Sequence, residues 1–506
     1  MTLRRADALL VGAVLVLAFG LRVIALGQPA DGPAGHVFDE RYFADAACRD
    51  LSGQDYLDPE PPLGKLLIAA GIEVGSLWLR YPQQPSPFAG PPCRPQPAGY
   101  GTWGWRLASL AFGVGLVALI YLLAMSLWPS RVFATLAAVL VTFDGLEFVQ
   151  SRLAMLDIFP VFFAVLALLM LQVHRRAQTS AGWWISAATL GLAIGLGVAS
   201  KWTALAAWGV AVVVLAGGWV LDRVSINAGS WHSGTAGAES RIRPGPLRSI
   251  DRVSVYTGFL IILPAIVYVL SYARYVMVAH AIPVTAPGSC DFSQVAVVSS
   301  ALDPGHWLQT VFRHDRWAYA YHLCETRIDP RGSPWFSWPL MLHPATYRSA
   351  VVYNAGGEQL SVLWDLGNPA LWWAAIPALI YCALSGIRSA RLTPAFIALA
   401  YLAAWLPFAF VPRGLYLYHM LGALPYMALA VAYAFTRLSD GRLDLVNRHW
   451  RLTIPGGRVT VAYLLVVVAT FIFFYPLWTG TPVSREEYRQ RIWLDLPQVR
   501  VDWRSG

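Results

Sequence analysis

Charged side chains are scarce in this sequence. Asp, Glu, Lys and Arg make up 13% of its 506 residues, whereas 57% are hydrophobic and the mean hydropathy is +0.50. Soluble globular domains carry about twice that share of charge, so the composition excludes an ordinary soluble protein. The sequence also lacks the GxxxxGK[ST] motif that cradles nucleotide phosphates, which argues against a cytoplasmic nucleotide-dependent enzyme.

Long apolar runs are what the sequence has in abundance. We count about eleven that could cross a hydrocarbon core of roughly 30 Å, and two short ones leave ten or twelve as alternatives. Helices are expected, because unpaired backbone groups are costly in lipid. The prediction is a single all-α polytopic membrane domain over residues 1–506. Its spans are 8–27, 105–127, 132–147, 152–173, 182–199, 203–221, 253–272, 366–386, 393–412, 414–436 and 459–478.

Arginines alternate between the predicted loops and fix an orientation. With the N-terminus in the cytoplasm, most of them fall on the inner side, as the positive-inside rule requires. The net charge of +9 is therefore a matter of topology and gives no case for nucleic acid binding. The first run resembles a signal peptide but lacks a small-residue cleavage site, so we expect a retained helix. Residues 28–104, 273–365 and 479–506 are expected outside, and 222–252 is expected to be a cytoplasmic loop.

Four of the five cysteines lie in the two long outer loops. An even number of cysteines on the oxidising side predicts disulfides, and the simplest pairing stays within each loop. The predicted bonds are Cys48–Cys93 and Cys290–Cys324, with thiols buried in loop packing as the alternative. Cys382 falls within a span.

Four basic residues lie on the expected outer side, contrary to the positive-inside rule. They are Arg106 at the start of the second span, Arg152 at the start of the fourth, and Lys201 and Arg413 at outer turns. A single Lys or Arg at this depth would need no ligand, because its long side chain can place the charge at the membrane–water interface. Four at the same depth indicate an anion site, and a membrane-embedded phosphate or diphosphate fits their chemistry.

Carboxylates are expected at that same depth. The stretch "HVFDERYF" places Asp39 and Glu40 just past the first run, and Asp157 falls about a turn and a half into the fourth. A carboxylate beside a bound phosphate can deprotonate an incoming hydroxyl as general base, or hold a divalent cation. The structural alternative for Asp39 and Glu40 is an N-cap pair for the helix that follows.

A second polar stretch, "DPEPPLGKLLIAAG", predicts a short amphipathic helix on the outer membrane face. Lys65 in this helix is expected to pair with Glu60, to contact a substrate phosphate, or to anchor the helix at the interface.

The second outer loop and the tenth span add aromatic and histidine candidates. His322 could donate to a phosphate or orient an acceptor. Trp335 and Trp338 could stack on sugar or peptide, with an aromatic belt at the head-group level as the alternative. His419 is expected inside the tenth span, two helical turns from Arg413, facing the bundle interior.

Together these motifs resemble the bacterial branch of the protein O-mannosyltransferases, glycosyltransferase family 39, in the GT-C superfamily. The resemblance rests on "FDERYF", "PPLGK", "WRLASLAFG", "FDGLEFVQSRLAMLDIF", "GVASKWTAL", "SPWFSWPLM" and "RGLYLYHMLGALPY", which occur in the family's order along most of the chain. It implies a GT-C fold and inverting transfer of mannose from polyprenyl phosphate mannose to Ser or Thr hydroxyls. The acceptors would be secreted or membrane proteins outside the bacterial plasma membrane, with the Sec translocon as a candidate partner.

The resemblance also implies roles for individual residues. Asp39 would be the general base, and Glu40 would orient Asp39 or the acceptor. Arg106 would contact the donor phosphate, and Arg152 and Asp157 would belong to the same pocket. No cofactor is required by this mechanism, although a divalent cation is compatible with it. The full set expected to bind the phosphate is Arg106, Arg152, Lys201, Arg413 and Lys65.

Two departures from the family pattern stand out. Glu60 occupies the position before "PPLGK" where the family usually has His, and the long outer loop is too short for the soluble β-trefoil domain of eukaryotic members. Two other functions are weighed against this one. The first is a related GT-C transferase that acts on a glycolipid or cell-wall glycan, which the order of motifs disfavours. The second is a transporter of the polyprenyl carrier, which would usually show repeats and midplane charges.

Overall fold

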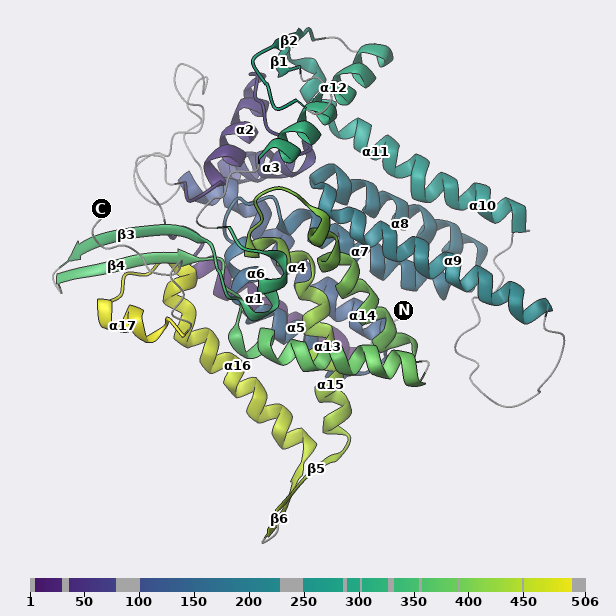
Figure 1. The fold of residues 1–506 in the computed structure, drawn as a ribbon, viewed down its shortest axis with the longest axis vertical. Coiled ribbons are helices and arrows are strands. Elements are labelled where there is room, and N and C mark those ends of the chain that lie inside the picture. The colour runs from purple at the N-terminus through teal and green to yellow at the C-terminus, as the bar shows by residue number, and fades with distance from the viewer. Residues whose placement is uncertain are drawn as a thin grey trace.

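The computed structural model describes residues 5–29, 36–78, 101–227, 249–284, 289–300, 303–325, 332–354, 357–389, 391–447 and 450–493. The described chain is mainly helical (Figure 1). The helices are α1 (Arg5–Ile24), α2 (Glu40–Ser52), α3 (Leu63–Trp78), α4 (Gly101–Leu127), α5 (Arg131–Thr142), α6 (Gly145–Gln150), α7 (Ile158–Arg175), α8 (Ser180–Ser200), α9 (Leu205–Asn227), α10 (Ser249–Thr257), α11 (Leu263–Ser271), α12 (Pro304–Cys324), α13 (Pro369–Ser389), α14 (Leu392–Trp405), α15 (Leu424–Ser439), α16 (Gly456–Thr479) and α17 (Arg485–Gln490).

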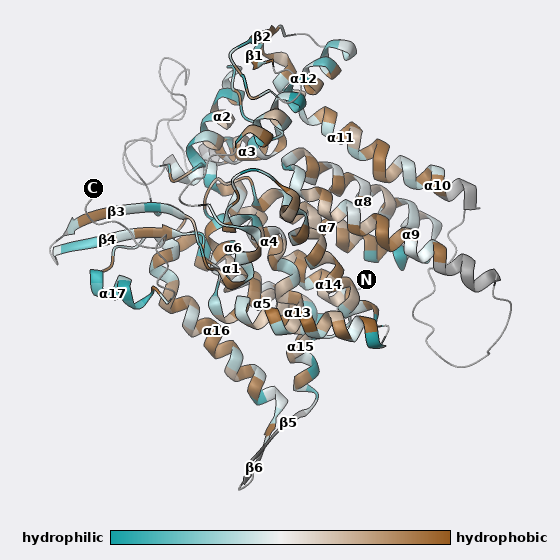
Figure 2. Ribbon diagram, viewed as in Figure 1, coloured by the Kyte–Doolittle hydropathy of each residue, from teal (hydrophilic) through white to brown (hydrophobic). Residues whose placement is uncertain are grey.

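Membrane-spanning helices form the body of the molecule. Among the described residues, nine helical segments are long and apolar enough to cross a membrane. Hydrophobic residues predominate along the helices of the bundle, whereas hydrophilic residues gather on α2, α12 and α17 (Figure 2). The prediction of an all-α polytopic membrane fold is therefore confirmed, although two of the predicted spans are not single long helices.

Those two spans are corrections to the sequence prediction. The predicted span 132–147 is α5, of 12 residues, followed after Thr142 by the short α6. At 1.5 Å per residue α5 covers only about 18 Å. Asp144 ends the run, because its carboxylate accepts a hydrogen bond from the Glu147 N–H and caps α6. The predicted span 414–436 begins with a 3₁₀ turn over Leu417–Gly422, and its α-helix, α15, starts only at Leu424.

The start of the predicted fourth span is also corrected. Residues 151–157 are not α-helical, and α7 begins at Ile158. Arg152 therefore lies in a link between α6 and α7, and Asp157 is the N-cap residue of α7 instead of lying within a helix. This link carries polar residues past the end of the helix, where they can reach the outer elements.

An outer cap lies over one end of the bundle, formed by α2, α3, α12 and the strands β1 (His280–Pro283) and β2 (Val295–Val298) (Figure 1). The disulfide Cys290–Cys324 joins the segment before β2 to the end of α12, with 5.5 Å between the two Cα atoms. This predicted bond is confirmed. The other predicted bond involves Cys93, which lies outside the described residues, and Cys382 is a buried free thiol.

Two further antiparallel pairs of strands extend from the body. β3 (Thr346–Asn354) pairs with β4 (Gly357–Trp364) in a hairpin that projects beside the helices (Figure 1). The end of the chain holds this hairpin, because Leu360 and Val483 exchange both backbone hydrogen bonds, at 2.8 and 2.9 Å. β5 (Arg442–Asn447) and β6 (Trp450–Pro455) connect α15 to α16 at the end of the molecule away from the cap (Figure 1).

Candidate active site

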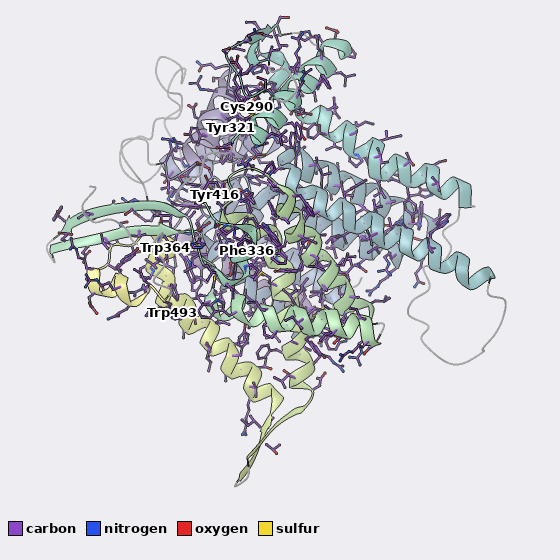
Figure 3. The ribbon with its side chains drawn as sticks, in the orientation of Figure 1. Cys290, Tyr321, Phe336, Trp364, Tyr416 and Trp493 are labelled. Carbon is purple, nitrogen blue, oxygen red and sulfur yellow. A yellow bond between two sulfur atoms is a disulfide. The ribbon has the colours of Figure 1, made fainter. Side chains whose placement is uncertain are left out.

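A cavity of about 750 Å³ lies between the outer cap and the end of the bundle. Its wall comes from α2, the loop before α3, the link before α7, the turn between α8 and α9, α12 and the segment after α14. Figure 3 labels Tyr321 and Tyr416, which belong to this wall. The predicted site residues on the wall are Asp39, Glu60, Asp157, Lys201, His322 and Arg413.

Asp39 reaches the cavity from the N-cap position of α2. Its side chain makes no capping hydrogen bond, so the capping alternative does not explain it. The preceding residue, Phe38, has φ of +54°, a backbone conformation that costs energy for any residue with a side chain. The Phe38 ring stacks on Tyr347 at 4.3 Å between centroids, which holds this turn in place. The strained turn presents the Asp39 carboxylate to the cavity.

Glu40 points away from the cavity and into the protein. Its carboxylate is fully buried and accepts hydrogen bonds from the backbone N–H groups of Val37 and Ala154, both at 3.0 Å. It also accepts hydrogen bonds from Nε and Nη2 of Arg106, each at 2.7 Å. Through these contacts, Glu40 fixes the turn that holds Asp39 against α4 and against the link before α7.

Arg106, predicted to contact the donor phosphate, lies behind the cavity wall. The guanidinium is fully buried, and besides Glu40 it donates to the carbonyl oxygens of Leu26 at 2.9 Å and Pro29 at 3.0 Å. Nε, Nη1 and Nη2 all have partners and the residue is absent from the cavity wall, so in this structure Arg106 positions the Asp39 turn. Its contact with a donor phosphate stays a prediction.

Arg152, also predicted to contact the phosphate, likewise lies behind the wall. It is fully buried and donates to the carbonyl oxygens of Ala25 and Gln28, and to that of Trp478 at 2.6 Å. The guanidinium also lies over the Phe148 ring, 4.5 Å from its centroid. Arg152 therefore joins α1 to the end of α16 and takes no part in lining the cavity.

Lys201 is a cation that the cavity does expose. Its Nζ lies 2.9 Å from the Asp157 carboxylate and 3.7 Å from that of Glu60. Burial alone would raise the pKa of Glu60, but the neighbouring cations, Lys201 foremost, outweigh it and lower that pKa below its usual value. The Glu60 carboxylate is therefore ionised beside the ammonium group, and three predicted residues from separate parts of the sequence meet.

Arg413 is a further cation on the cavity wall. Its guanidinium donates to Nδ1 of His322 on α12 and lies 3.7 Å from the Glu325 carboxylate. A guanidinium has no acceptor, so His322 must be neutral with its proton on Nε2. Burial lowers the pKa of His322 to about 4; the Glu60 carboxylate opposes this shift and the Arg413 charge adds to it. His322 thus holds Arg413 at the cavity instead of meeting a phosphate as a cation.

Lys65 lies behind the wall. It is buried, forms an ion pair with Asp58 at 2.6 Å and donates to the carbonyl oxygen of Glu60. Its partner is Asp58, which lines the cavity, and not the Glu60 carboxylate, while Lys65 itself is absent from the wall. Its contact with a substrate phosphate stays a prediction. Lys65 fixes the backbone of the loop that carries Glu60. α3 packs against α2 and α4.

The predicted pocket residues Trp335, Trp338 and His419 lie away from the large cavity. Trp338 is fully buried, donates from Nε1 to the Ser333 hydroxyl at 2.8 Å and stacks on His419. Trp335 packs against Trp405 with 5.1 Å between centroids. None of these side chains lines the large cavity. His419 is in the 3₁₀ turn before α15, not inside a long helix, and faces a narrower groove.

Tyrosines make the aromatic wall that the sequence analysis missed. Tyr416 and Tyr418 line the cavity and stack on each other at 5.3 Å between centroids, and Lys201 Nζ lies 5.8 Å from the Tyr418 ring. The aromatic-rich stretch "GLYLYH" directly after Arg413 was the available signal. Glu325 was also missed.

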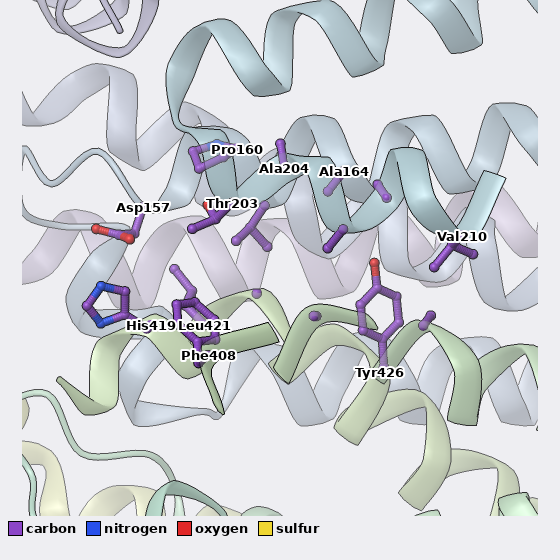
Figure 4. Close-up of a pocket in the computed structure, with 16 residues that line it drawn as sticks. Asp157, Pro160, Ala164, Thr203, Ala204, Val210, Phe408, His419, Leu421 and Tyr426 are labelled. Carbon is purple, nitrogen blue, oxygen red and sulfur yellow. The ribbon is translucent and has the colours of Figure 1, made fainter. Parts of the chain in front are cut away.

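A narrow apolar groove adjoins the cavity at Asp157. It follows α7, α9, α14 and the start of α15, with Val161, Ala207, Ala400 and Tyr426 among its lining residues (Figure 4). Asp157 lines both spaces, so the polar cavity and this groove meet at the Lys201 ion pairs. The site therefore places cations and carboxylates at the end of an apolar path between spanning helices. Across the described part of the chain, no three His, Cys, Asp or Glu side chains are arranged to hold a metal ion.

Two family sequence models match this chain. The one described as dolichyl-phosphate-mannose-protein mannosyltransferase matches residues 12–280, and the one described as the C-terminal four TMM region of protein-O-mannosyltransferase matches residues 312–496. Every residue of the cavity wall lies within one of these two ranges.

Curated relatives and a solved structure agree with these matches. The chain is 27% identical to a polyprenol-phosphate-mannose–protein mannosyltransferase of Mycolicibacterium smegmatis, covering 95% of this chain and 91% of the relative. A Mycobacterium tuberculosis protein of the same name is 26% identical, over 96% and 90%. The fold is similar to the S. cerevisiae protein O-mannosyltransferase Pmt1-Pmt2 complex bound to the sugar donor, with a TM-score of 0.70, 14% identity, and coverage of 98% and 93%.

Proposed function

This chain belongs to the dolichyl-phosphate-mannose-protein mannosyltransferase family, and we propose that it transfers mannose from polyprenyl phosphate mannose to Ser or Thr hydroxyls of proteins. As a family member it is a multi-pass membrane glycosyltransferase. The observation that carries the proposal is one cavity whose wall brings the Asp39 carboxylate together with the cations Lys201 and Arg413.

The proposed donor site begins at the apolar groove. The prenyl chain lies between α7, α9 and α14, and its phosphate lies at the Asp157 end, within reach of Lys201 and Arg413. The leaving phosphate gains negative charge in the transition state, and cations already in place stabilise that charge without reorganisation. The tyrosine wall at Tyr416 and Tyr418 then borders the sugar.

Asp39 is the proposed general base. It takes the proton of the acceptor hydroxyl as the oxygen attacks the anomeric carbon of mannose from the face opposite the phosphate. The bond from the sugar to the phosphate oxygen breaks with its electron pair, which leaves polyprenyl phosphate and a mannosylated acceptor with inverted configuration. We propose no cofactor, because Lys201 and Arg413 supply the positive charge that the leaving group needs.

The proposed setting is the outer face of a bacterial plasma membrane. The arginine distribution supports a cytoplasmic N-terminus, which puts the cap and its disulfide Cys290–Cys324 on the oxidising side. Acceptors there are exported chains still extended as they leave the Sec translocon.

A transfer assay tests the proposed function. Purified protein in nanodiscs, given polyprenyl phosphate mannose and a Ser/Thr-rich peptide, should yield mannosylated peptide detectable by mass spectrometry. The same peptide with every Ser and Thr replaced by Ala should stay unmodified. Donor binding without any peptide transfer would contradict the protein acceptor and direct the search to glycolipid or glycan acceptors.

The His322–Arg413 contact predicts a pH dependence of donor use. As pH falls toward about 4, His322 takes up a proton and can no longer accept from Arg413, so we expect the donor KM to rise. The unfolded chain binds that proton from about pH 6.5 downward, so folding stability also falls between pH 6.5 and 4. KM and thermal unfolding should be measured over this range.

Two variants make the pH test specific. His322→Gln keeps an acceptor for Arg413 but cannot be protonated, so its donor KM should be less sensitive to pH than that of the wild type. His306→Gln, on the same helix but away from the cavity wall, should keep the wild-type profile. Identical profiles for all three proteins would remove His322 from this role.

A further inference from the structure

A network of hydrogen bonds behind the cavity wall connects the turn that carries Lys201 to α11 and α12. Trp202, the residue after Lys201, donates from Nε1 to the Tyr268 hydroxyl on α11 at 3.1 Å. That hydroxyl donates to Asp315 Oδ1 on α12 at 2.7 Å. Tyr272, the C-cap residue of α11, donates to the same carboxylate oxygen at 2.8 Å. Asp315 is therefore a junction that joins α11, α12 and the turn between α8 and α9.

The same network reaches the loop that carries Glu60. His314 Nδ1 lies 2.9 Å from the Tyr272 hydroxyl, and His314 Nε2 donates to the carbonyl oxygen of Asp58 at 3.0 Å. The Asp58 carboxylate accepts a hydrogen bond from the Glu60 N–H, also at 3.0 Å. Tyr272 and His314 are almost completely buried. The network thus holds the two wall segments whose side chains, Lys201 and Glu60, form an ion pair in the cavity.

Trp202 also contacts the residue that supports Arg413. Its indole ring meets the His322 ring edge to face, with 6.0 Å between the centroids. His322 accepts a hydrogen bond from Arg413. His322 follows Asp315 by about two turns of α12, so both side chains leave the same side of that helix. Trp202 is therefore next to Lys201 in the chain and touches the side chain that holds Arg413.

A polar junction is not needed for stability alone. Replacing buried ionic and polar groups with apolar ones of similar volume often leaves a protein equally stable. Hydrogen bonds instead fix distances and angles, and a fully connected buried network makes the surrounding structure rigid. Two cations that bind one phosphate require this, because a binding constellation must be held within about 0.5 Å.

We propose that Tyr268 and Asp315 are positioning residues for the donor phosphate. They set the distance between Lys201 and Arg413, so that both cations meet one phosphate group. This inference rests on the proposed function and adds the groups that prepare its donor site. Neither Tyr268 nor Asp315 lines the cavity, so their effect passes through Trp202 to the two cations.

Tyr268→Phe tests the proposal by removing one hydroxyl. The ring stays, but the hydrogen bonds with Trp202 and Asp315 are lost. The Kd for polyprenyl phosphate mannose, measured with radiolabelled donor in nanodiscs, should rise about fivefold or more, the loss expected for one hydrogen bond. The KM for the acceptor peptide should stay the same. Tyr319→Phe, at an exposed position on α12, is the matched control and should behave as the wild type.

A purely structural role gives a different result. It would lower the thermal unfolding midpoint and the fraction of active protein, while the folded fraction would bind the donor with the wild-type Kd. An unchanged donor Kd in Tyr268→Phe would therefore overturn the proposal, whatever happens to the unfolding midpoint.

A double-mutant cycle shows whether Tyr268 acts through the cations. Lys201→Met and Arg413→Met each remove one positive charge from the cavity wall. If Tyr268 serves to place these cations, Tyr268→Phe should raise the donor Kd by a smaller factor in either background than in the wild type. Independent sites give additive effects. Full additivity in both backgrounds would mean that Tyr268 acts separately, and would overturn the proposal.

Two substitutions of Asp315 test the junction itself. Asp315→Asn keeps an oxygen that can accept from both tyrosine hydroxyls, so its donor Kd should stay close to that of the wild type. Asp315→Leu has similar volume but no acceptor, and its donor Kd should rise as in Tyr268→Phe. Equal donor Kd values for the two variants would contradict the role of Asp315. Should Asp315→Leu fail to fold, the Tyr268→Phe cycle decides the question.

The readouts separate this proposal from the proposed function. Wild-type protein that does not bind polyprenyl phosphate mannose contradicts the proposed function. Wild-type protein that binds the donor and transfers mannose, with an unchanged donor Kd in Tyr268→Phe, contradicts only the positioning role.

Discussion

Asp39→Asn is expected to abolish transfer while leaving donor binding largely intact. The amide keeps the size and polar character of the side chain but cannot accept the hydroxyl proton at neutral pH. Loss of a general base lowers rates by about 10²–10⁴-fold. Lys201 and Arg413, the proposed phosphate contacts on the cavity wall, remain in the variant. Turnover should therefore be lost while the affinity for the donor is retained.

Asp45→Asn is the matched control. Asp45 lines the same cavity from the next turns of α2, but its side chain is 44% exposed and pairs with Arg49. Exposed pairs of this kind contribute about 0–1 kcal/mol to stability, so folding and turnover should change little. Retained turnover in Asp39→Asn, or equal loss in both variants, would remove Asp39 as the base.

Arg106→Ala is expected to have its largest effect on stability. The substitution leaves the Glu40 carboxylate buried without its cation, and breaking a buried pair in this way costs about 3–5 kcal/mol. The carbonyl oxygens of Leu26 and Pro29 lose their donor as well. The thermal unfolding midpoint in detergent should fall sharply, and turnover should fall with it because Glu40 also holds the turn that carries Asp39.

Arg413→Met separates this positioning role from a donor contact. Arg413 lies on the cavity wall, with a side chain 19% exposed, so its loss should weaken donor binding with little effect on the unfolding midpoint. A charge-assisted contact is worth about 1.5–3 kcal/mol, which corresponds to a donor Kd at least tenfold higher. If Arg106→Ala instead kept its stability and lost donor affinity, the buried pair would not be its main role.

The sequence predicted the membrane fold and part of the cavity for definite reasons. Apolar runs report spanning helices directly, and a cation or carboxylate beside them is costly enough to indicate a purpose. Asp39, Asp157, Lys201 and Arg413 were found in this way and meet at one cavity.

What could not be predicted was which cations face the cavity. Arg106 and Lys201 look alike in sequence, each at an outer helix end. The difference comes from partners distant in the chain: the carbonyl oxygens of Leu26 and Pro29 enclose Arg106, whereas Lys201 meets two carboxylates at the cavity. The burial of Trp338 could not be predicted either. Its stacking partner His419 lies in a 3₁₀ turn, in a stretch for which hydrophobicity alone predicted a helix.

The ion pairs around Lys201 have a consequence for turnover. In the resting protein this ammonium group already has two internal counter-ions, Asp157 and Glu60. On the proposed mechanism, an incoming phosphate exchanges places with a carboxylate instead of occupying a bare cation. Small inorganic anions, which bring no prenyl chain, then compete poorly with the carboxylates already present. After transfer the same carboxylates return to Lys201 as the spent carrier departs, which lowers the barrier to product release and frees the site for the next donor.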